Sequence, residues 1–229
     1  MSAKILVINP GSTSTKIAVY ESENPVMVRN IPHSTEELKQ FAKITDQLSF
    51  RRDLVIAELE KLNIPFQFDI IIGRGGLSKP VKGGVYRVNK QMCDDTYHAI
   101  RTHACNLGCS IAYELANRIP NCTPMIADPG MVDELADVAR ITGSPLMPRI
   151  PIWHALNQRA IARRFAKEQG KKYEELNLIV CHMGGGVSVA AHQHGLVVDN
   201  YNVKDEGAFG MDRGGSLPVN AVINLCFSG

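Results

Sequence analysis

The 229-residue sequence lacks a long hydrophobic run, a large excess of charge of one sign and a paired cysteine motif. No stretch approaches the roughly 18 apolar residues of a membrane span, and the early apolar run at 5–8 is too short for a signal-peptide core. Lys and Arg number 25 against 23 Asp and Glu, which excludes the basic excess of most nucleic-acid-binding proteins. These absences exclude membrane, secreted, disordered and fibrous classes and predict a soluble, cytoplasmic protein without nucleic-acid or membrane partners.

The six cysteines show no CxxC spacing and no disulfide framework. Cys105 and Cys109 are four residues apart with His103 nearby, so a metal site there is one interpretation. It would need further ligands that the neighbouring sequence does not offer. Reduced cysteines in a protein core are the favoured interpretation.

Apolar and β-branched runs between turn residues predict strands at 5–8, 17–20, 69–72, 85–88, 125–127, 178–181, 187–191 and 196–199. A capping box at 34–37 predicts the start of one helix. Periodicity predicts further helices over 51–62, 94–118, 153–168 and 219–229. The prolines at 145, 148 and 151 predict a boundary between a first domain, residues 1–148, and a second, residues 149–229.

Two segments have the same layout of strand, small-residue turn and strand. One turn is Asn9–Ser12 and the other is His182–Gly186. Turns of Gly and Ser expose backbone N–H groups without side-chain bulk, as the binding of a phosphate chain requires. Each turn alone is as consistent with a plain hairpin as with a phosphate site. Together they favour a duplicated unit that holds one polyphosphate between two turns.

Seven motifs, in order along almost the whole chain, resemble the acetokinase family of acetate, propionate and butyrate kinases, within the sugar kinase, Hsp70 and actin superfamily. They are Val7–Lys16, Gly73–Gly76, His103–Gly108, Asp128–Gly130, Trp153–Gln158, His182–Gly186 and Glu206–Arg213. The forms at 73–76, 103–108 and 154–158 are similar to the butyrate kinase branch. The resemblance implies an α/β fold of two ribonuclease-H-like domains, as in actin-like ATPases. The first would bind carboxylate and phosphate, and the second would bind nucleotide.

The resemblance also implies the reaction. ATP and butyrate, or another short-chain fatty acid, would give ADP and butyryl phosphate by reversible, in-line phosphoryl transfer with Mg²⁺. Acetate, propionate or branched-chain acids are alternative substrates, and a catalytically inactive ATP-fold module is an alternative of another class. Full-length members of the family are expected to be homodimers.

By resemblance, two sets of residues form the site. The expected nucleotide- and phosphate-binding residues are Asn9, Ser12, Ser14, Lys16, His182, Gly184, Gly185 and Gly186, with Asn9 also a metal ligand. The expected catalytic residues are Arg74, His103, Asp128, His154 and Arg213. The two arginines would clamp the transferring group and the carboxylate, because a guanidinium binds such groups bidentately. His154 would stabilise the transition state by hydrogen bonding.

Four of the five expected catalytic residues, and also Lys16, have a purely structural interpretation as well. Arg74 between glycines suits a surface turn, and Asp128 before Pro-Gly is an ordinary turn residue. His103 falls within the expected helix 94–118, where a packed histidine is common. His154 suits a core histidine at a helix start, and Lys16 an exposed strand residue. The order of the motifs favours the functional interpretation.

Other residues are predicted to lie on the surface. His192 and His194 flank a hairpin turn and are expected to be exposed. In the helix 153–168 the expected solvated face is Arg159, Arg163 and Lys167, opposite an apolar stripe of Leu156, Ala160, Ile161 and Phe165.

The sequence departs from the family pattern near its end. Residues 208–213, Ala-Phe-Gly-Met-Asp-Arg, replace the expected Pro-Phe-Ser-Pro-Glu-Arg, so the loop around Arg213 differs. The second domain would hold only about 80 residues, few for a sheet covered on both faces. We therefore expect a chain truncated in its second domain, with the adenosine site and a further acidic metal ligand beyond residue 229.

Overall fold

The computed structural model describes residues 2–99 and 101–228, which form two compact units. Unit 1 holds the described residues up to Pro80 and the segment Gly84–Pro129, and unit 2 holds Val81–Gly83 and the residues from Gly130 onward. The division by contacts thus falls at residue 129. The expected functional boundary at residue 148 stays a prediction.

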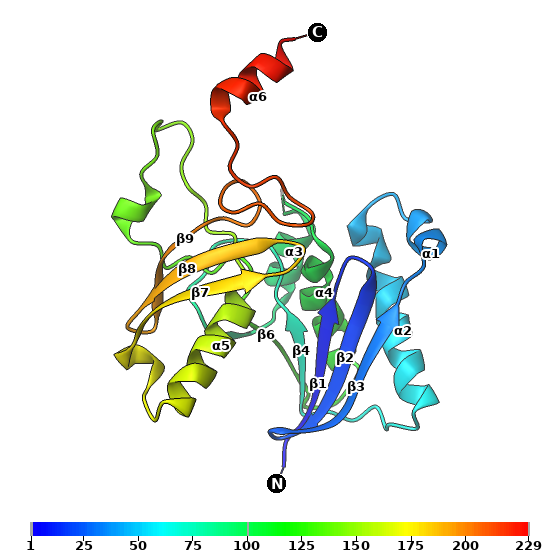
Figure 1. The fold of residues 1–229 in the computed structure, drawn as a ribbon. Coiled ribbons are helices and arrows are strands. Elements are labelled where there is room, and N and C mark those ends of the chain that lie inside the picture. The colour runs from blue at the N-terminus through cyan, green and yellow to red at the C-terminus, as the bar shows by residue number, and fades with distance from the viewer. Residues whose placement is uncertain (1, 100, 229) are drawn as a thin grey trace. The chain divides into compact units, whose positions relative to one another are not determined.

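Unit 1 is built on a six-stranded sheet in the order β3-β2-β1-β4-β6-β5 (Figure 1). Its strands are β1 (Lys4–Pro10), β2 (Ser14–Glu21), β3 (Asn24–Pro32), β4 (Ile70–Arg74), β5 (Val85–Arg87) and β6 (Thr123–Ala127). β1, β2 and β3 form an antiparallel meander, β4 pairs parallel with β1, and β6 pairs parallel with β4. The carboxyl ends of β1, β4 and β6 therefore share one edge, which is where α/β sheets bind ligands.

The core of unit 1 lies where helices pack on this sheet. The helical segments are α1 (Thr35–Lys39), η1 (Ile44–Gln47), α2 (Leu48–Lys61), α3 (Lys90–Tyr97), η2 (Ala104–Asn106) and α4 (Leu107–Ala116). Fully buried side chains of β1, β4, α2 and α4 include Leu6, Ile8, Val55, Ile71, Ile111 and Leu115. The capping box predicted at Ser34 is confirmed, since Ser34 and Glu37 cap each other's backbone.

The single helix expected over 94–118 is wrong, because α3, η2 and α4 are separate there. Side chains hydrogen-bond the backbone in the interval and so compete with the helix. His103 precedes η2, where its Nδ1 accepts from the N–H of Cys105 at 3.2 Å. The buried Asn106 amide exchanges hydrogen bonds with the main chain of Leu77.

Unit 2 contains a three-stranded antiparallel sheet, β7-β8-β9, with α5 beside it (Figure 1). Its elements are η3 (Asp137–Arg140), α5 (Ala155–Glu168), η4 (Tyr173–Glu175), β7 (Asn177–Met183), β8 (Val187–Gln193), β9 (Leu196–Asn200) and α6 (Val219–Cys226). One small core joins Trp153 to Ala190 and Val197, and another joins alanines of α5 to Tyr173. β7 is an edge strand of this sheet.

The predicted layout of strand, small-residue turn and strand is confirmed at both places, since each unit has an antiparallel hairpin there. β1 and β2 are joined by residues 11–13, and β7 and β8 by residues 184–186. The pair one step before the last in each hairpin is Asn9 with Lys16 and His182 with Ser188. Asn9 and His182 therefore occupy equivalent positions, as do Lys16 and Ser188.

The buried face of α5 is not the predicted one. Leu156, Ile161 and Phe165 are exposed, whereas the residues that α5 buries are Ala155, Gln158, Arg159, Ala162 and Ala166. Alanines let a helix approach a sheet closely, and the two polar side chains find buried partners. Arg159 donates to Glu134 at 2.9 Å, so it is not part of a solvated face.

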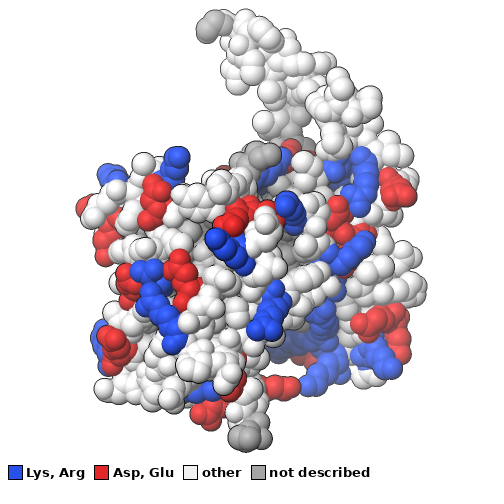
Figure 2. Space-filling model, turned by 180° about the vertical axis from the view of Figure 1, so that it is seen from behind, with Lys and Arg blue, Asp and Glu red and all other residues white. Residues whose placement is uncertain are grey.

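None of the helices within residues 2–99 and 101–228 combines the length and the apolar character needed to cross a bilayer. Figure 2 shows Lys and Arg interspersed with Asp and Glu over the face that it draws. This mixture agrees with the formal net charge of +2.

Candidate active site

Three predicted site residues form a row across the sheet of unit 1. Lys16 on β2 is paired with Asn9 on β1, and the parallel register of β1 with β4 brings Arg74 beside Asn9. The Arg74 Nη1 atom lies 3.5 Å from Asn9 Oδ1. Arg74 is paired in turn with Ala127, so Asp128 follows at the same carboxyl edge. The strand register thus groups four residues that are far apart in the sequence.

Asp128 is buried and has a φ of +34°, which is uncommon for a residue other than glycine. Its Oδ1 accepts from the N–H of Gly84 at 2.8 Å, and its own N–H donates to the Gly84 carbonyl. These bonds hold a strained backbone at the sheet edge. Strain of this kind clusters at functional sites.

The glycines around Arg74 permit close packing. A Cβ on Gly73 would overlap the Gly108 carbonyl, and one on Gly76 would overlap Asn106. The motif at 103–108 therefore supports the segment that carries Arg74. His103 itself is half-buried at the start of η2, and its expected catalytic role stays a prediction.

Arg51 of α2 lies beneath the first turn, and sequence analysis missed it. Its side chain is 1% exposed. The guanidinium donates to the carbonyls of Gly11 at 2.8 Å, Ser14 at 3.2 Å and Ser12 at 3.4 Å. The remaining carbonyl of the turn, that of Thr13, accepts from the His33 N–H. Every carbonyl from residue 11 to residue 14 thus has a donor within unit 1.

This arrangement leaves donors for a ligand. Ser12 and Thr13 are exposed, and their N–H groups donate to no other backbone group among the described residues. Burial lowers the pKa of Arg51 to about 10, so the guanidinium is charged at neutral pH. The turn therefore combines exposed N–H groups with a buried positive charge, and this favours an anion. No periodicity reveals such an arginine, because its partners lie some 40 residues earlier.

The loop that carries Arg213 packs against the second turn, residues 184–186. The N–H of Gly184 donates to Gly186 O at 3.2 Å, and the N–H of Asp212 donates to Gly185 O at 3.0 Å. A side chain on Gly186 would overlap the guanidinium of Arg213. The structure thus brings the glycine turn and Arg213 together within unit 2.

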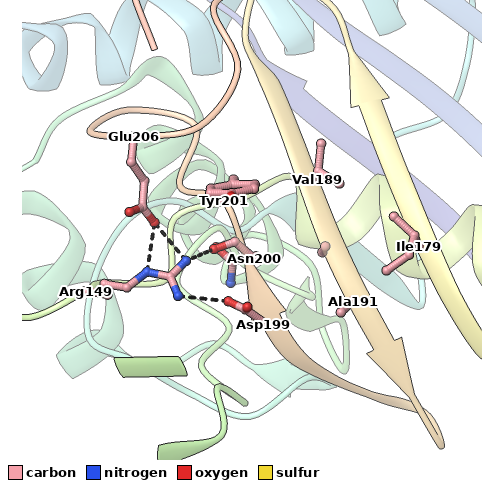
Figure 3. Close-up of a pocket in the computed structure, with 9 residues that line it drawn as sticks. Arg149, Ile179, Val189, Ala191, Asp199, Asn200, Tyr201 and Glu206 are labelled. Atoms are coloured by element: carbon pink, nitrogen blue, oxygen red, sulfur yellow. Dashed lines mark hydrogen bonds and ion pairs between the residues drawn. The ribbon is translucent and has the colours of Figure 1, made fainter. Parts of the chain in front are cut away.

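Arg149 holds the start of the loop that leads to Arg213. It pairs with Asp199 at 2.9 Å and with Glu206 at 3.0 Å, and it also donates to the Asn200 carbonyl (Figure 3). These residues line a pocket of about 300 Å³ that contains none of the predicted site residues. The contacts among these lining residues are those by which Arg149 anchors the loop.

His154 and His182 stack beside the glycine turn. Their ring centroids are 3.6 Å apart, and the rings are 11° from parallel. His154 Nδ1 lies 2.7 Å from Ser188 Oγ, and His182 Nδ1 lies 2.9 Å from Asn157 Oδ1. His182 is the last but one residue of β7, and the glycine turn follows directly after Met183. The stacked rings and the glycines therefore form one group.

The prediction that His192 is exposed is wrong. Its side chain is buried on β8, 2.6 Å from Tyr173 Oη and 3.2 Å from Gln158 Oε1. Burial, helped by the charge of Arg159, lowers the pKa of His192 to about 4, so the ring is neutral at neutral pH. His194 is exposed as predicted.

The described residues do not fit a metal ion by themselves. They contain no cluster of three or more His, Cys, Asp or Glu suited to a metal. The oxygen of Asn9 faces Arg74, whereas Mg²⁺ is usually bound through carboxylates and the phosphates of a substrate.

Comparisons with known proteins agree with the motifs. A model of the acetokinase family matches residues 152–202. The chain is 65% identical over 227 residues to a probable butyrate kinase of Bacteroides thetaiotaomicron, covering 99% of this chain and 64% of the relative. It is 47% identical over 232 residues to butyrate kinase 2 of Clostridium acetobutylicum, covering 100% of this chain and 65% of the relative.

Solved structures show the same fold. The acetate kinase of Porphyromonas gingivalis matches with a TM-score of 0.74 at 15% identity, over 99% of this chain and 64% of that one. A propionate kinase of Francisella tularensis matches with a TM-score of 0.68 at 15% identity, over 99% and 65%. The α/β fold class is therefore confirmed. The chain spans about 64% of the length of its curated relatives.

Proposed function

The chain belongs to the acetokinase family, and from this premise we propose that the protein containing it transfers the γ-phosphoryl group of ATP to butyrate. The products are ADP and butyryl phosphate, and the reaction is reversible. The observation that carries the proposal is the 65% identity with a probable butyrate kinase over 99% of the chain.

The chemistry demands positioning and charge rather than covalent catalysis. A carboxylate oxygen attacks the γ-phosphorus, the bond from that phosphorus to the bridging oxygen breaks, and ADP leaves. The carboxylate is already ionised at neutral pH, so its attack needs no base. Negative charge on the transferring group must be neutralised and its oxygens held in line.

Unit 1 supplies cations and donors for this step. Lys16 and Arg74 flank Asn9, and the turn with Ser12 and Ser14 offers N–H and hydroxyl donors to phosphate oxygens. Asp128 and His103 are proposed to act beside this row.

Unit 2 supplies a second set of cations and hydrogen-bond donors. The turn of Gly184, Gly185 and Gly186 is proposed to face the phosphates, with the N–H groups of Gly185 and Gly186 as donors and His182 beside them. Arg213 is proposed to clamp the transferring group or the carboxylate bidentately. His154 is proposed to donate a hydrogen bond to that group in the transition state.

A hydroxamate assay for acyl phosphate tests the proposal. The full-length protein is supplied with ATP, Mg²⁺ and acids of two to five carbons. We expect the highest kcat/KM with butyrate, and losses of about 10³-fold or more in Arg74→Ala and Arg213→Ala. Arg29→Ala, on the exposed strand β3, is the matched control and keeps the activity. No acyl phosphate from any acid would refute the proposal, and a preference for acetate or a branched acid would reassign the substrate.

Further properties stay predictions. They are ATP and ADP as nucleotides, Mg²⁺ bound with the nucleotide, a cytoplasmic location and a homodimer of the full-length protein. The described residues alone do not support a metal site, so no step is assigned to the metal.

A further inference from the structure

Five side chains of unit 2 form a continuous hydrogen-bonded series that ends at His154. Tyr173 Oη lies 2.6 Å from His192 Nδ1, and His192 Nε2 lies 3.2 Å from Gln158 Oε1. Gln158 Nε2 lies 2.9 Å from Ser188 Oγ, which lies 2.7 Å from His154 Nδ1. All but His154 are nine-tenths buried or more, so solvent does not compete for these bonds.

Gln158 determines which atom donates and which accepts in each hydrogen bond of the series. Its Nε2 also donates to the main-chain carbonyl of Ser188 at 3.1 Å, and a carbonyl can only accept. The amide therefore turns its NH₂ group toward Ser188 and its oxygen toward His192. Because that oxygen can only accept, His192 must carry its proton on Nε2.

The other end of the His192 ring agrees with this direction. A neutral imidazole protonated on Nε2 has a lone pair on Nδ1, and Tyr173 can donate its hydroxyl proton there. Burial lowers the pKa of His192 to about 4, and this keeps the ring neutral. Tyr173 and His192 thus present a single proton arrangement to Gln158.

The hydrogen bonds of Ser188 determine which nitrogen of His154 carries the proton. Its oxygen accepts from Gln158 Nε2 and also from the main-chain N–H of His154 at 3.4 Å. With those lone pairs engaged, its single hydroxyl proton points at His154 Nδ1. A neutral His154 then has its lone pair on Nδ1 and its proton on Nε2.

We propose that Gln158, Ser188 and His192 are positioning residues that fix His154 as the Nε2–H tautomer, so that Nε2 donates to the transferring phosphoryl group. This rests on the proposed function for the identity of the acceptor, but the tautomer itself follows from the hydrogen bonds alone. The benefit is a donor that is oriented before substrate binds and costs no reorganisation during transfer.

Nitrogen-15 spectra of the 229-residue chain, labelled on histidine, test the tautomer at pH 7.5. We expect His154 to show a protonated Nε2 and a bare Nδ1. In Ser188→Ala the signals should shift toward a mixture of both tautomers, and Ser188→Thr, which keeps the hydroxyl, should restore the single form. His194→Asn, at the exposed hairpin turn next to β8, is the matched control and leaves His154 unchanged. A proton on Nδ1 in the unsubstituted chain, or no change in Ser188→Ala, would overturn the proposal.

Activity of the full-length protein supplies the second readout. Ser188→Ala should lower kcat about tenfold, a fraction of the effect of losing a transition-state donor outright, with each KM changed less than about twofold. Ser188→Thr should recover most of the rate, and an equal loss in both variants would overturn the positioning role. If His154 has the expected tautomer but no acyl phosphate forms, the proposed function fails and the assigned tautomer stands. If acyl phosphate forms while His154 is protonated on Nδ1, only this inference fails.

Discussion

Arg51 and His192 are both buried ionisable side chains, yet they have opposite charge states at neutral pH. Arg51 stays charged because its ordinary pKa is so high that burial lowers it only to about 10. His192 becomes neutral because burial moves its pKa to about 4. The first can therefore act as a fixed cation beneath a turn, and the second as a hydrogen-bonding group with one proton.

Replacing Arg51 by methionine should weaken anion binding by the 229-residue chain about tenfold, because the turn loses a buried charge and its carbonyls lose donors. The free energy of unfolding should also fall by about 2–4 kcal/mol. Isothermal titration with inorganic pyrophosphate, together with urea unfolding, measures both. Arg52→Met is the matched control, since Arg52 forms ion pairs with Asp53 and Glu114 and does not contact the turn. Equal pyrophosphate affinities in the two variants would contradict the assignment.

The low pKa of His192 makes the stability of unit 2 depend on pH. Well above pH 6.5, the ordinary pKa of histidine, the ring is neutral in both the folded and the unfolded chain, so it contributes no pH dependence. As the pH falls toward 4, only the unfolded chain takes up the proton, and the free energy of unfolding should be about 2 kcal/mol lower at pH 5 than at pH 7.5.

Trp153 reports this change, because it is the single tryptophan of the sequence and its ring centroid lies 6.0 Å from that of His192. Urea unfolding followed by Trp153 fluorescence should lose most of the pH difference in His192→Gln. His194→Asn should keep it. A pH difference of the same size in His192→Gln would show that other groups cause it.

At the scale of elements, the strands with apolar runs could be predicted, whereas β3 and the orientation of α5 could not. β3 is mostly exposed and begins near Pro25, so it lacks the alternation that marks a half-buried strand. On α5, the apolar stripe was expected to be buried. The buried alanines and the Arg159–Glu134 pair depend on Glu134, which lies 25 residues earlier.

The reversed face of α5 predicts which arginine matters for stability. Arg159→Met should lower the free energy of unfolding of unit 2 by about 3 kcal/mol, because it leaves Glu134 buried without its cation. Glu134 would still accept from the N–H groups of Gly83 and Val197. Lys167→Met, on the exposed face, should change stability by less than about 0.5 kcal/mol. Urea unfolding followed by Trp153 fluorescence measures both, and equal effects would refute the burial argument.

At the scale of the whole molecule, the two units share a meander, but their sheets continue differently. In unit 1, β4 covers the open edge of β1, whereas β7 is an edge strand in unit 2. The motif order predicted the grouping of Asn9, Lys16 and Arg74. It did not predict Arg51 or the buried series ending at His154, because hydrogen bonds between distant segments leave no periodic signal.

The edge at β7 should make the 229-residue chain self-associate. An edge strand offers unpaired backbone groups, and Ile179 and Met183 on β7 are 71% and 80% exposed. Ile179→Lys should raise the monomer fraction in sedimentation velocity. Val28→Lys on β3 should not, since that edge already has Pro25 and Pro32. Unchanged association in Ile179→Lys would place the contact elsewhere.

The equivalent positions in the two hairpins also bear on which substitutions such a protein can tolerate. Asn9 and Lys16 in one hairpin correspond to His182 and Ser188 in the other, and each pair sits on a complete backbone ladder. Since main-chain atoms maintain each ladder, the side chains at these positions of one hairpin can change without disturbing the other hairpin. Two hairpins of the same layout thus carry different chemistry, with Asn9 and Lys16 on the first and the hydrogen-bonding His182 and Ser188 on the second.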